Sequence, residues 1–188
     1  FRKGEAQVLI GTQMIAKGHD FPNVTLVGVI AADMTLNLPD YRSPERTFEL
    51  IVQVAGRAGR AEQKGHVIVQ TYDPENYAIE AAARQDFRAF FETEFSRRRR
   101  GLDPPFTMLT RLLVEAADEK RARQTAEALA AEMEAFFAQN PLLRRQTVQM
   151  RAMEAPVKRL RGKARWQVFL KLYSRGPTPR VIEKLEAL

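Results

Sequence analysis

The sequence predicts two structural units in tandem: an α/β unit built on a parallel sheet, then a small α+β unit of ferredoxin-like type. The first prediction rests on three short runs of Val, Ile and Leu, with one helix signal between the second and third. The second rests on a β-α-β-β-α order of patterns from residue 108 onward. A Pro-rich break at residues 103–106 lies between them, and 188 residues suffice for one large domain or two small ones.

The apolar runs of the first unit cover residues 8–10, 24–30 and 67–69. Runs this rich in Val and Ile are typical of strands that are covered on both faces, as in a parallel sheet. Before the third run, Ser43 is expected to cap a helix and Pro44 to be its first residue, with an apolar stripe that ends at Gly56. Residues 8–71 therefore predict the order β-loop-β-loop-α-β.

One helical segment is expected over residues 74–100, with Pro74 opening it and Gly101 ending it after four consecutive arginines. Its aromatic stripe is expected to pack into a core rather than to bind a ligand, and consists of Phe87, Phe90, Phe91 and Phe95.

The second unit is expected to contain a strand at 108–114, a long helix at 118–139, a weaker strand at 148–153, a strong strand at 166–172 and a short helix at 179–188. The chain is accordingly expected to divide into residues 1–73, a connecting segment 74–106 and a C-terminal unit 107–188.

Charge is distributed unevenly along the chain. Residues 1–96 contain 10 Lys+Arg and 13 Asp+Glu, whereas residues 97–188 contain 20 and 10, so the formal net charge of +7 comes from the second half. A basic half indicates a polyanionic partner, although solubility alone is the alternative. The absence of Cys excludes disulfides and Cys-ligated zinc within these residues, and no metal site is expected here. No apolar run approaches the roughly 20 residues that span a bilayer.

The segment VLIGTQMIAKGHDF, residues 8–21, would deliver polar groups to the carboxyl end of a strand, where α/β sheets bind ligands. Thr12 and Lys17 are candidates for contacts to nucleic-acid phosphates. Gly18 permits close backbone approach, and Asp20 could accept a hydrogen bond near a nucleotide. A tight turn with a capping Asp20 is an equally good interpretation of the segment taken alone.

The segment QVAGRAGR, residues 53–60, carries Arg57 and Arg60, which would share a face if the helix continues through them. Two guanidinium groups so placed suit bidentate phosphate recognition or transition-state stabilisation in phosphoryl transfer, with Gln53 one turn earlier as a further polar contact. A solvated basic helix end is the alternative. If the hypothesis holds, the two arginines are aimed into a nucleotide cleft that another lobe completes.

Taken together, these two segments resemble motifs V and VI of superfamily 2 helicases, which makes the first unit part of a RecA-like second helicase lobe. The stretches KGHDFPNV, ERTF, AAARQDFRAFFETEFSRRR and LRGKARW further resemble the primosomal protein N′ family of replication-restart helicases. The resemblance implies that Thr12 contacts the DNA strand, and that Gln53, Arg57 and Arg60 reach the ATP γ-phosphate as catalytic residues.

The resemblance also implies an ATP-dependent 3′→5′ DNA helicase that recognises stalled or abandoned replication forks and restarts replication through primosome assembly. Expected partners are forked and single-stranded DNA, single-stranded DNA-binding protein and primosome proteins, in the cytoplasm and away from membranes. ATP and Mg²⁺ would bind at a site shared with an upstream lobe, and zinc would bind in an upstream region. This segment alone is expected to be inactive, because it has no phosphate loop and no acidic Mg²⁺ box. The alternatives are a RecG-like translocase and a non-catalytic basic binding module.

A dense basic segment precedes Trp166 and is expected to bind a DNA backbone as a loop, through Lys158, Arg159, Arg161, Lys163 and Arg165. A solvated hairpin loop is the alternative, and Trp166 itself is expected in the core. Asp33, Asp40 and Glu45 could form a carboxylate cluster, but loop capping is the preferred interpretation.

Overall fold

The computed structural model describes residues 1, 4–12, 24–56, 58 and 65–173, which form two compact units, Phe1–Arg97 and Arg98–Leu188. The division falls inside one helix, and each unit is described by itself. None of the described helices is both long and apolar enough to cross a membrane.

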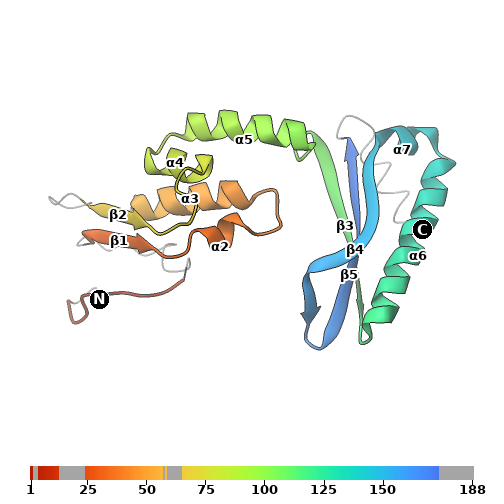
Figure 1. Ribbon diagram of the computed structural model, residues 1–188, viewed down its shortest axis with the longest axis horizontal. Helices are drawn as coiled ribbons and strands as arrows, with labels where there is room; N and C mark the ends of the chain where they lie inside the picture. The colour runs from red at the N-terminus through yellow and green to blue at the C-terminus, as the bar shows by residue number, and fades with distance from the viewer. Residues whose placement is uncertain (2–3, 13–23, 57, 59–64, 174–188) are drawn as a thin grey trace. The chain divides into compact units, whose positions relative to one another are not determined.

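The first unit is built on two parallel strands, β1 (Leu26–Val29) and β2 (His66–Val69), which pair in register from Leu26 with His66 to Val29 with Val69. The connection between them contains the short helix α2 (Asp33–Leu36) and the helix α3 (Ser43–Ala55), which lies against the sheet (Figure 1). Parallel strands need such a crossover because a tight turn cannot join them. The predicted parallel α/β arrangement is therefore confirmed, while α2 falls where a loop was expected.

Helix α3 begins one residue earlier than predicted. Ser43 is the first helical residue, and its hydroxyl donates a 2.8 Å hydrogen bond to the carbonyl of Leu38. The N-cap is Arg42, without a side-chain cap, so the assignment of Ser43 as N-cap is wrong. The predicted end is correct, because the last helical residue is Ala55 and Gly56 occupies the C-cap.

The expected single helix over residues 74–100 is two helices, α4 (Tyr77–Ala83) and α5 (Phe87–Gly101). Asn76 caps α4 by accepting from the amide of Ala78, and the Asp86 carboxylate accepts from the amide of Ala89 in the first turn of α5. Gln85 between them has a φ of 53°, which interrupts a right-handed helix. Helix propensity and the aromatic stripe did not reveal this break, because Gln is a good helix former.

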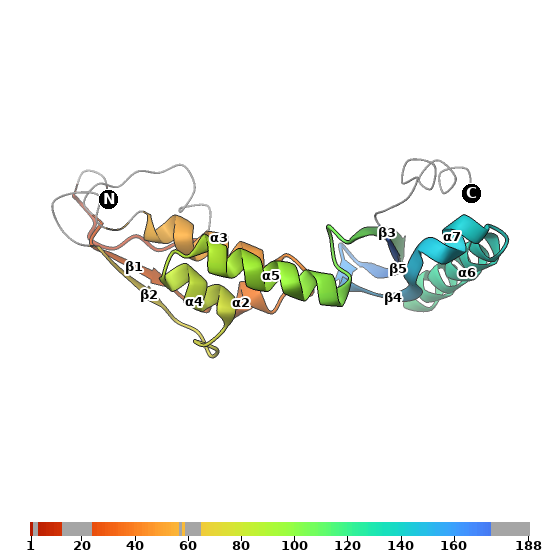
Figure 2. The same cartoon turned by 90° about the horizontal axis from the view of Figure 1, so that it is seen from above.

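An aromatic cluster joins the helices of the first unit, which lie side by side in Figures 1 and 2. The rings of Phe48 in α3 and Phe90 in α5 are stacked at 4.4 Å, and Tyr77 of α4 stacks on Phe90 at 6.0 Å. Core packing of the phenylalanine stripe is confirmed for Phe90 alone. The other members remain 64%, 50% and 39% exposed, and are Phe87, Phe91 and Phe95.

Two expectations for the first unit's strands are wrong. Residues 8–10 form no strand, and Val8 and Ile10 are 73% and 90% exposed, because no described strand pairs with them. Among the described residues, those that cover β1 and β2 lie on one face of the strands. Val29 and Val69 pack on the helical core, whereas Leu26 and Ile68 on the opposite face remain exposed. An apolar run shows that a strand can be buried, but only neighbouring elements decide whether it is.

The second unit is a three-stranded antiparallel sheet with helices on one face. In chain order it contains β3 (Thr107–Ala116), α6 (Glu119–Ala138), α7 (Pro141–Gln146), β4 (Thr147–Leu160) and β5 (Lys163–Tyr173). The sheet order is β3-β5-β4, so β5 inserts antiparallel between two strands joined by α6. This split β-α-β arrangement is the ferredoxin-like pattern predicted, although α7 was not foreseen. The helix expected at residues 179–188 lies outside the described residues.

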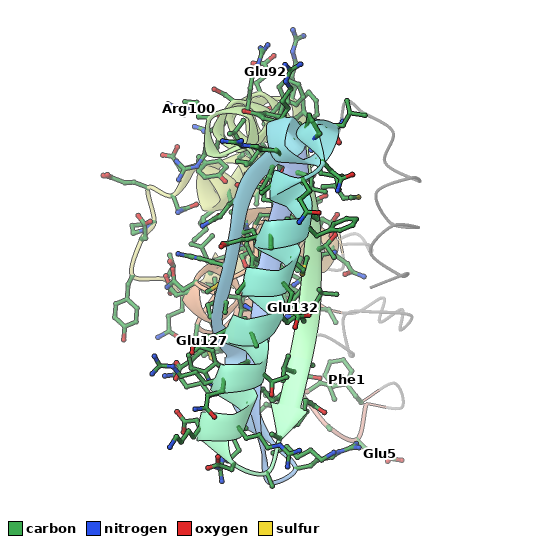
Figure 3. The ribbon with its side chains drawn as sticks, turned by 90° about the vertical axis from the view of Figure 1, so that its right-hand side faces the viewer. Phe1, Glu5, Glu92, Arg100, Glu127 and Glu132 are labelled. Atoms are coloured by element: carbon green, nitrogen blue, oxygen red, sulfur yellow. The ribbon has the colours of Figure 1, made fainter. Side chains whose placement is uncertain are left out.

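Helix α6 lies along one face of the sheet, in front of the strands in Figure 3. It starts at the predicted place, because Asp118 caps it by accepting a 2.8 Å hydrogen bond from the amide of Arg121. Alternate residues of β5 face this helix and are at most 2% exposed: Val168, Leu170 and Leu172. They pack against Met133 and Phe137 of α6. The odd-numbered residues of β5 consequently point to the other face of the sheet.

Candidate nucleic-acid interface

The loops that follow β1 and β2 meet at the carboxyl edge of the first unit's sheet. Asp33, just after β1, accepts hydrogen bonds from Thr71 Oγ1 at 2.9 Å and from the amide of Tyr72 at 3.1 Å. Partial desolvation alone would raise the pKa of Asp33, but these hydrogen bonds lower the pKa below its usual value. Asp33 therefore ties two loops together, as the capping interpretation predicted.

Asp40 has a similar local role ahead of α3. Its carboxylate accepts from the backbone amide and the guanidinium of Arg42, and pairs with Arg46 at 3.1 Å. The hydrogen bond from the Arg42 side chain lowers the pKa of Asp40 below its ordinary value. Loop capping is thus confirmed for both aspartates, Asp33 and Asp40.

Two of the predicted motif residues lie in described parts of the first unit. Thr12 is exposed, in a stretch without regular structure. Gln53 is half-buried in the last turn of α3, just before the helix ends at Ala55. The described helix therefore contains neither arginine of the second motif. The remaining predicted residues lie outside the described residues: Lys17, Gly18, Asp20, Arg57 and Arg60.

The basic segment of the second unit is a β-hairpin rather than the loop expected. β4 runs to Leu160, β5 starts at Lys163, and these two residues pair across a two-residue turn. Arg161 and Gly162 in the turn have φ values of 49° and 78°. Positive φ at both positions defines the type I′ turn that matches the twist of antiparallel strands. Two residues between extended segments, the second a Gly, is a hairpin signal that the sequence contained.

The hairpin turn lies at the end of the third strand. β3 pairs with β5 as far as Ala116 opposite Ala164, so only the Leu160–Lys163 pair and the two turn residues lie beyond it. The ladder of β4 and β5 is also irregular between Glu154 and Arg159. Such an irregularity bends a strand and increases its twist. The hairpin therefore ends in a short basic tip beside the end of β3.

The five predicted basic residues of the hairpin differ in their surroundings. Lys158 pairs with Glu154 at 2.6 Å, and the Glu154 carboxylate raises the pKa of Lys158. Arg165 Nε lies 3.0 Å from Glu115 Oε1 on β3, and this side chain is 14% exposed. The other three are exposed, and no ion pair joins them to any described residue: Arg159, Arg161 and Lys163. Uncompensated positive charge is therefore concentrated at the tip.

Trp166 lies on the α6 side of β5 and packs against the core of the second unit. The guanidinium of Arg123 on α6 lies 5.7 Å from the centre of its ring. The expectation that Trp166 belongs to the core is confirmed, so the hairpin has no stacking partner in this residue.

The sequence comparisons agree with the geometry of the first unit. Residues 1–62 match the family model described as helicase conserved C-terminal domain. This span contains both predicted motifs and the β1-α3 part of the parallel β-α-β unit. The first unit is thus a helicase C-terminal domain segment, followed by an antiparallel α+β unit.

Similarity to curated proteins extends over nearly the whole chain. The chain is 40% identical over 185 residues to the replication restart protein PriA of Bacillus subtilis, which is 98% of the chain and 22% of that protein. It is 39% identical over 186 residues to PriA of Haemophilus influenzae, covering 98% of the chain and 24% of that protein. PriA of Chlamydia trachomatis is 49% identical over 113 residues, 60% of the chain and 15% of that protein. The chain belongs to the PriA family and corresponds to a C-terminal fragment.

The family resemblance predicted from the motifs is therefore confirmed. The RecG-like and non-catalytic alternatives are not favoured, because the helicase-domain match and the PriA relatives agree. The chain spans about a fifth to a quarter of the length of the relatives that it matches almost end to end.

Proposed function

We propose that the chain is the C-terminal part of an ATP-dependent 3′→5′ DNA helicase that acts at stalled or abandoned replication forks and restarts replication. The helicase-domain match over both motifs and the similarity to replication restart proteins support this function. Because the chain spans 22% of the Bacillus subtilis relative, unwinding and ATP hydrolysis are activities of the full-length protein. The chain alone is proposed to bind DNA without turning over ATP.

The observation that carries DNA binding by this chain is the hairpin tip, where Arg159, Arg161 and Lys163 are exposed and have no described ion-pair partner. Cations that are not neutralised within the protein can replace the counterions condensed on DNA phosphates. Lys158 and Arg165 are proposed to contribute less, because Glu154 and Glu115 already pair with them.

The salt dependence of binding tests this role. The chain should bind forked DNA with an affinity that falls as salt rises, and the triple variant Arg159→Gln/Arg161→Gln/Lys163→Gln should bind more weakly. Each lost phosphate contact lowers the slope of log affinity against log salt by about 0.9 on duplex DNA. The triple variant should therefore lose about two to three from that slope, measured by fluorescence anisotropy from 50 to 200 mM NaCl.

A matched control removes the same charge elsewhere. Lys120, Arg144 and Arg145 are exposed on α6 and α7, so their triple change to Gln alters the net charge equally without touching the hairpin. This control should keep most of the slope. Equal losses in both triple variants would show that net charge alone, and not the hairpin, attracts DNA.

Nucleotide chemistry is proposed for the second motif. Gln53, Arg57 and Arg60 would contact the ATP γ-phosphate, with Gly18 and Asp20 near the nucleotide and Thr12 and Lys17 on the DNA strand. The position of Gln53 in the last turn of α3 fits a polar group presented where the helix ends. In the full-length protein, Arg57→Ala or Arg60→Ala should reduce DNA-stimulated ATP hydrolysis by on the order of 10³-fold while DNA binding persists. Normal turnover in both variants would contradict this assignment.

The remaining parts of the proposal concern the full-length protein. ATP and Mg²⁺ would bind between this lobe and the preceding one, zinc would bind in an upstream region, and the protein would act in the cytoplasm with single-stranded DNA-binding protein and primosome proteins. The family similarity supports these parts. A direct test is the metal content of the purified full-length protein, which should include zinc, whereas this chain should contain none.

A further inference from the structure

The face of the second unit's sheet that points away from α6 carries a second set of side chains. The odd-numbered residues of β5 point to this face, because the even-numbered ones fill the core beneath α6. Within the described part of the second unit, helix α6 lies on the opposite face. The end of α5 meets this face beside Lys171, whose Nζ donates to the carbonyl of Gly101.

Strand register places three of these side chains in one row. Phe169 of the central strand β5 is directly opposite Arg111 of β3 on one side and Arg151 of β4 on the other. Directly opposite residues of an antiparallel sheet point to the same face. Neighbouring strands lie about 4.8 Å apart, so the two arginines flank the ring from backbones about 10 Å apart. Sequence reasoning missed this Arg–Phe–Arg row because it arises only from the pairing of three strands.

The row differs from the other basic positions on the same face. Arg165 lies four residues before Phe169 on β5, and Lys171 lies two residues after it. Both side chains are mostly buried, and they pair with Glu115 and Asp103 respectively. In contrast, Arg111 and Arg151 are exposed, and no ion pair joins either to a described residue. Phe169 is partly exposed, whereas its neighbours Val168 and Leu170 are fully buried.

A partly exposed aromatic ring between two uncompensated guanidinium groups has a specific chemistry. A nucleobase can stack on the ring, while the arginines attract the phosphates on either side of that base. A ring that lies in a sheet cannot reach the faces of bases that are stacked within a duplex, so the bases must be unpaired. An apolar peptide without acidic residues is a poorer ligand for this row than DNA, because it would leave both arginines without partners.

We propose that the Arg–Phe–Arg row (Arg111, Phe169 and Arg151) is a binding site for single-stranded DNA, in which a base stacks on Phe169 and the two arginines bind the adjoining phosphates. This inference rests on the proposed DNA-binding function. It assigns single-stranded DNA to a face of the sheet that is distinct from the hairpin tip. Lys163 at that tip lies on the same face of β5, with the buried Gln167 and the mostly buried Arg165 between it and the row.

The experiment compares two short oligonucleotides. An eight-nucleotide oligo-dT and an abasic oligonucleotide with the same phosphates are bound to the 188-residue chain and followed by fluorescence anisotropy. Phe169→Leu keeps an apolar side chain but removes the ring, and should weaken oligo-dT binding about tenfold while abasic binding is unchanged. Arg111→Gln/Arg151→Gln should weaken binding of both oligonucleotides, because phosphates are common to them.

The matched control for the arginine pair is Arg144→Gln/Arg145→Gln on α7, which removes the same charge outside this face and should change binding less than twofold. Thermal melting by circular dichroism checks the fold of each variant. Ultraviolet crosslinking of oligo-dT to the unaltered chain gives an independent reading, in which the crosslinked peptide should contain Phe169.

Failure of this proposal is distinguishable from failure of DNA binding itself. If the hairpin triple variant loses DNA while Phe169→Leu binds oligo-dT normally and the crosslink maps elsewhere, the row is not a site and the hairpin role remains. Equal weakening of dT and abasic binding by Phe169→Leu would overturn base stacking. No binding of DNA by the unaltered chain would remove both proposals together.

Discussion

The two units differ in how completely the apolar side chains of their strands are buried. In the second unit, every core-facing residue at the middle of β5 lies beneath α6, and Val168 and Leu170 are fully buried. In the first unit, α3 covers one face of two strands, and Leu26, Ile30 and Ile68 remain exposed. The first unit's strands are continuous apolar runs, whereas β5 alternates apolar and polar residues, so a helix on one face leaves apolar side chains exposed in the first unit. In the second unit, α6 covers the apolar face of the sheet, whereas in the first unit some apolar side chains of the strands stay exposed.

Two alanine substitutions, one in each unit, test this comparison with the largest expected effect. Leu170→Ala should lower the free energy of unfolding of the second unit by about 2–5 kcal/mol, because it opens a cavity in a closed core. Ile68→Ala, on a side chain 62% exposed, should cost less than about 1 kcal/mol.

Trp166 is the chain's one tryptophan and lies in the second unit, so its fluorescence in urea follows that unit alone. Hydrogen exchange resolved by peptide follows β2. Comparable losses for the two substitutions would show that the open face of β1 and β2 is covered in solution.

A second test concerns the buried cation of the second unit. Lys171 Nζ donates to Asp103 Oδ1 at 2.9 Å and to the carbonyl of Gly101 at 3.1 Å, which joins the end of β5 to the segment before β3. Lys171→Met keeps most of the apolar stem but leaves these acceptors unpaired, and should lower stability by about 2 kcal/mol. Lys163→Met at the exposed hairpin tip is the control and should change Trp166-monitored unfolding little. Equal midpoints in urea would contradict a structural role for Lys171.

The corresponding polar contact of the first unit is Tyr77 with Glu94. The Tyr77 hydroxyl donates to the mostly buried Glu94 carboxylate, and joins α4 to α5. Tyr77→Phe keeps the ring stacked near Phe90 and removes the donor, so it should cost about 1 kcal/mol. Faster hydrogen exchange confined to α4 and the first turns of α5 would support this expectation, and an unchanged exchange pattern would contradict it. Tyr72→Phe, at a tyrosine 94% exposed, is the neutral control.

The smallest expected effect is a pH dependence in the first unit. The Arg42 side chain lowers the folded-state pKa of Asp40 below its ordinary value of 3.8. A lowered folded pKa stabilises the fold above the ordinary pKa, and this contribution disappears as the pH falls through the folded value. Because the pair is partly exposed, it should be worth about 0.5 kcal/mol.

Asp40→Asn should therefore reduce stability near pH 6 and flatten the decline below about pH 4 in the first unit. Unfolding of the second unit, followed by Trp166, should be unaffected at every pH. An identical decline in the variant and the unaltered chain would show that Asp40 is not the titrating group.

Much of the second unit could be predicted from sequence because its signals are local and mutually consistent. Helix α6 lies within one residue of the range that its apolar periodicity predicted, and alternation identified β5 with Trp166 in the core. The basic segment was assigned to a loop, although Gly162 belongs to a two-residue turn signal. The reason is that a run of basic residues hides the alternation by which a strand is recognised. The first unit's helix end at Ala55 was also predicted, while the break at Gln85 was not.

By itself, the sequence determined the family, the parallel α/β start, the split β-α-β unit and the basic character of residues 158–165. These follow from residue identity, spacing and periodicity, which are properties of the chain. Only the tertiary structure decided that Lys158 and Arg165 are paired while three hairpin cations are not, and that Phe169 lies between Arg111 and Arg151. Those facts depend on strand register and on carboxylates brought from other strands or turns, and no local pattern encodes which residues will be neighbours across a sheet.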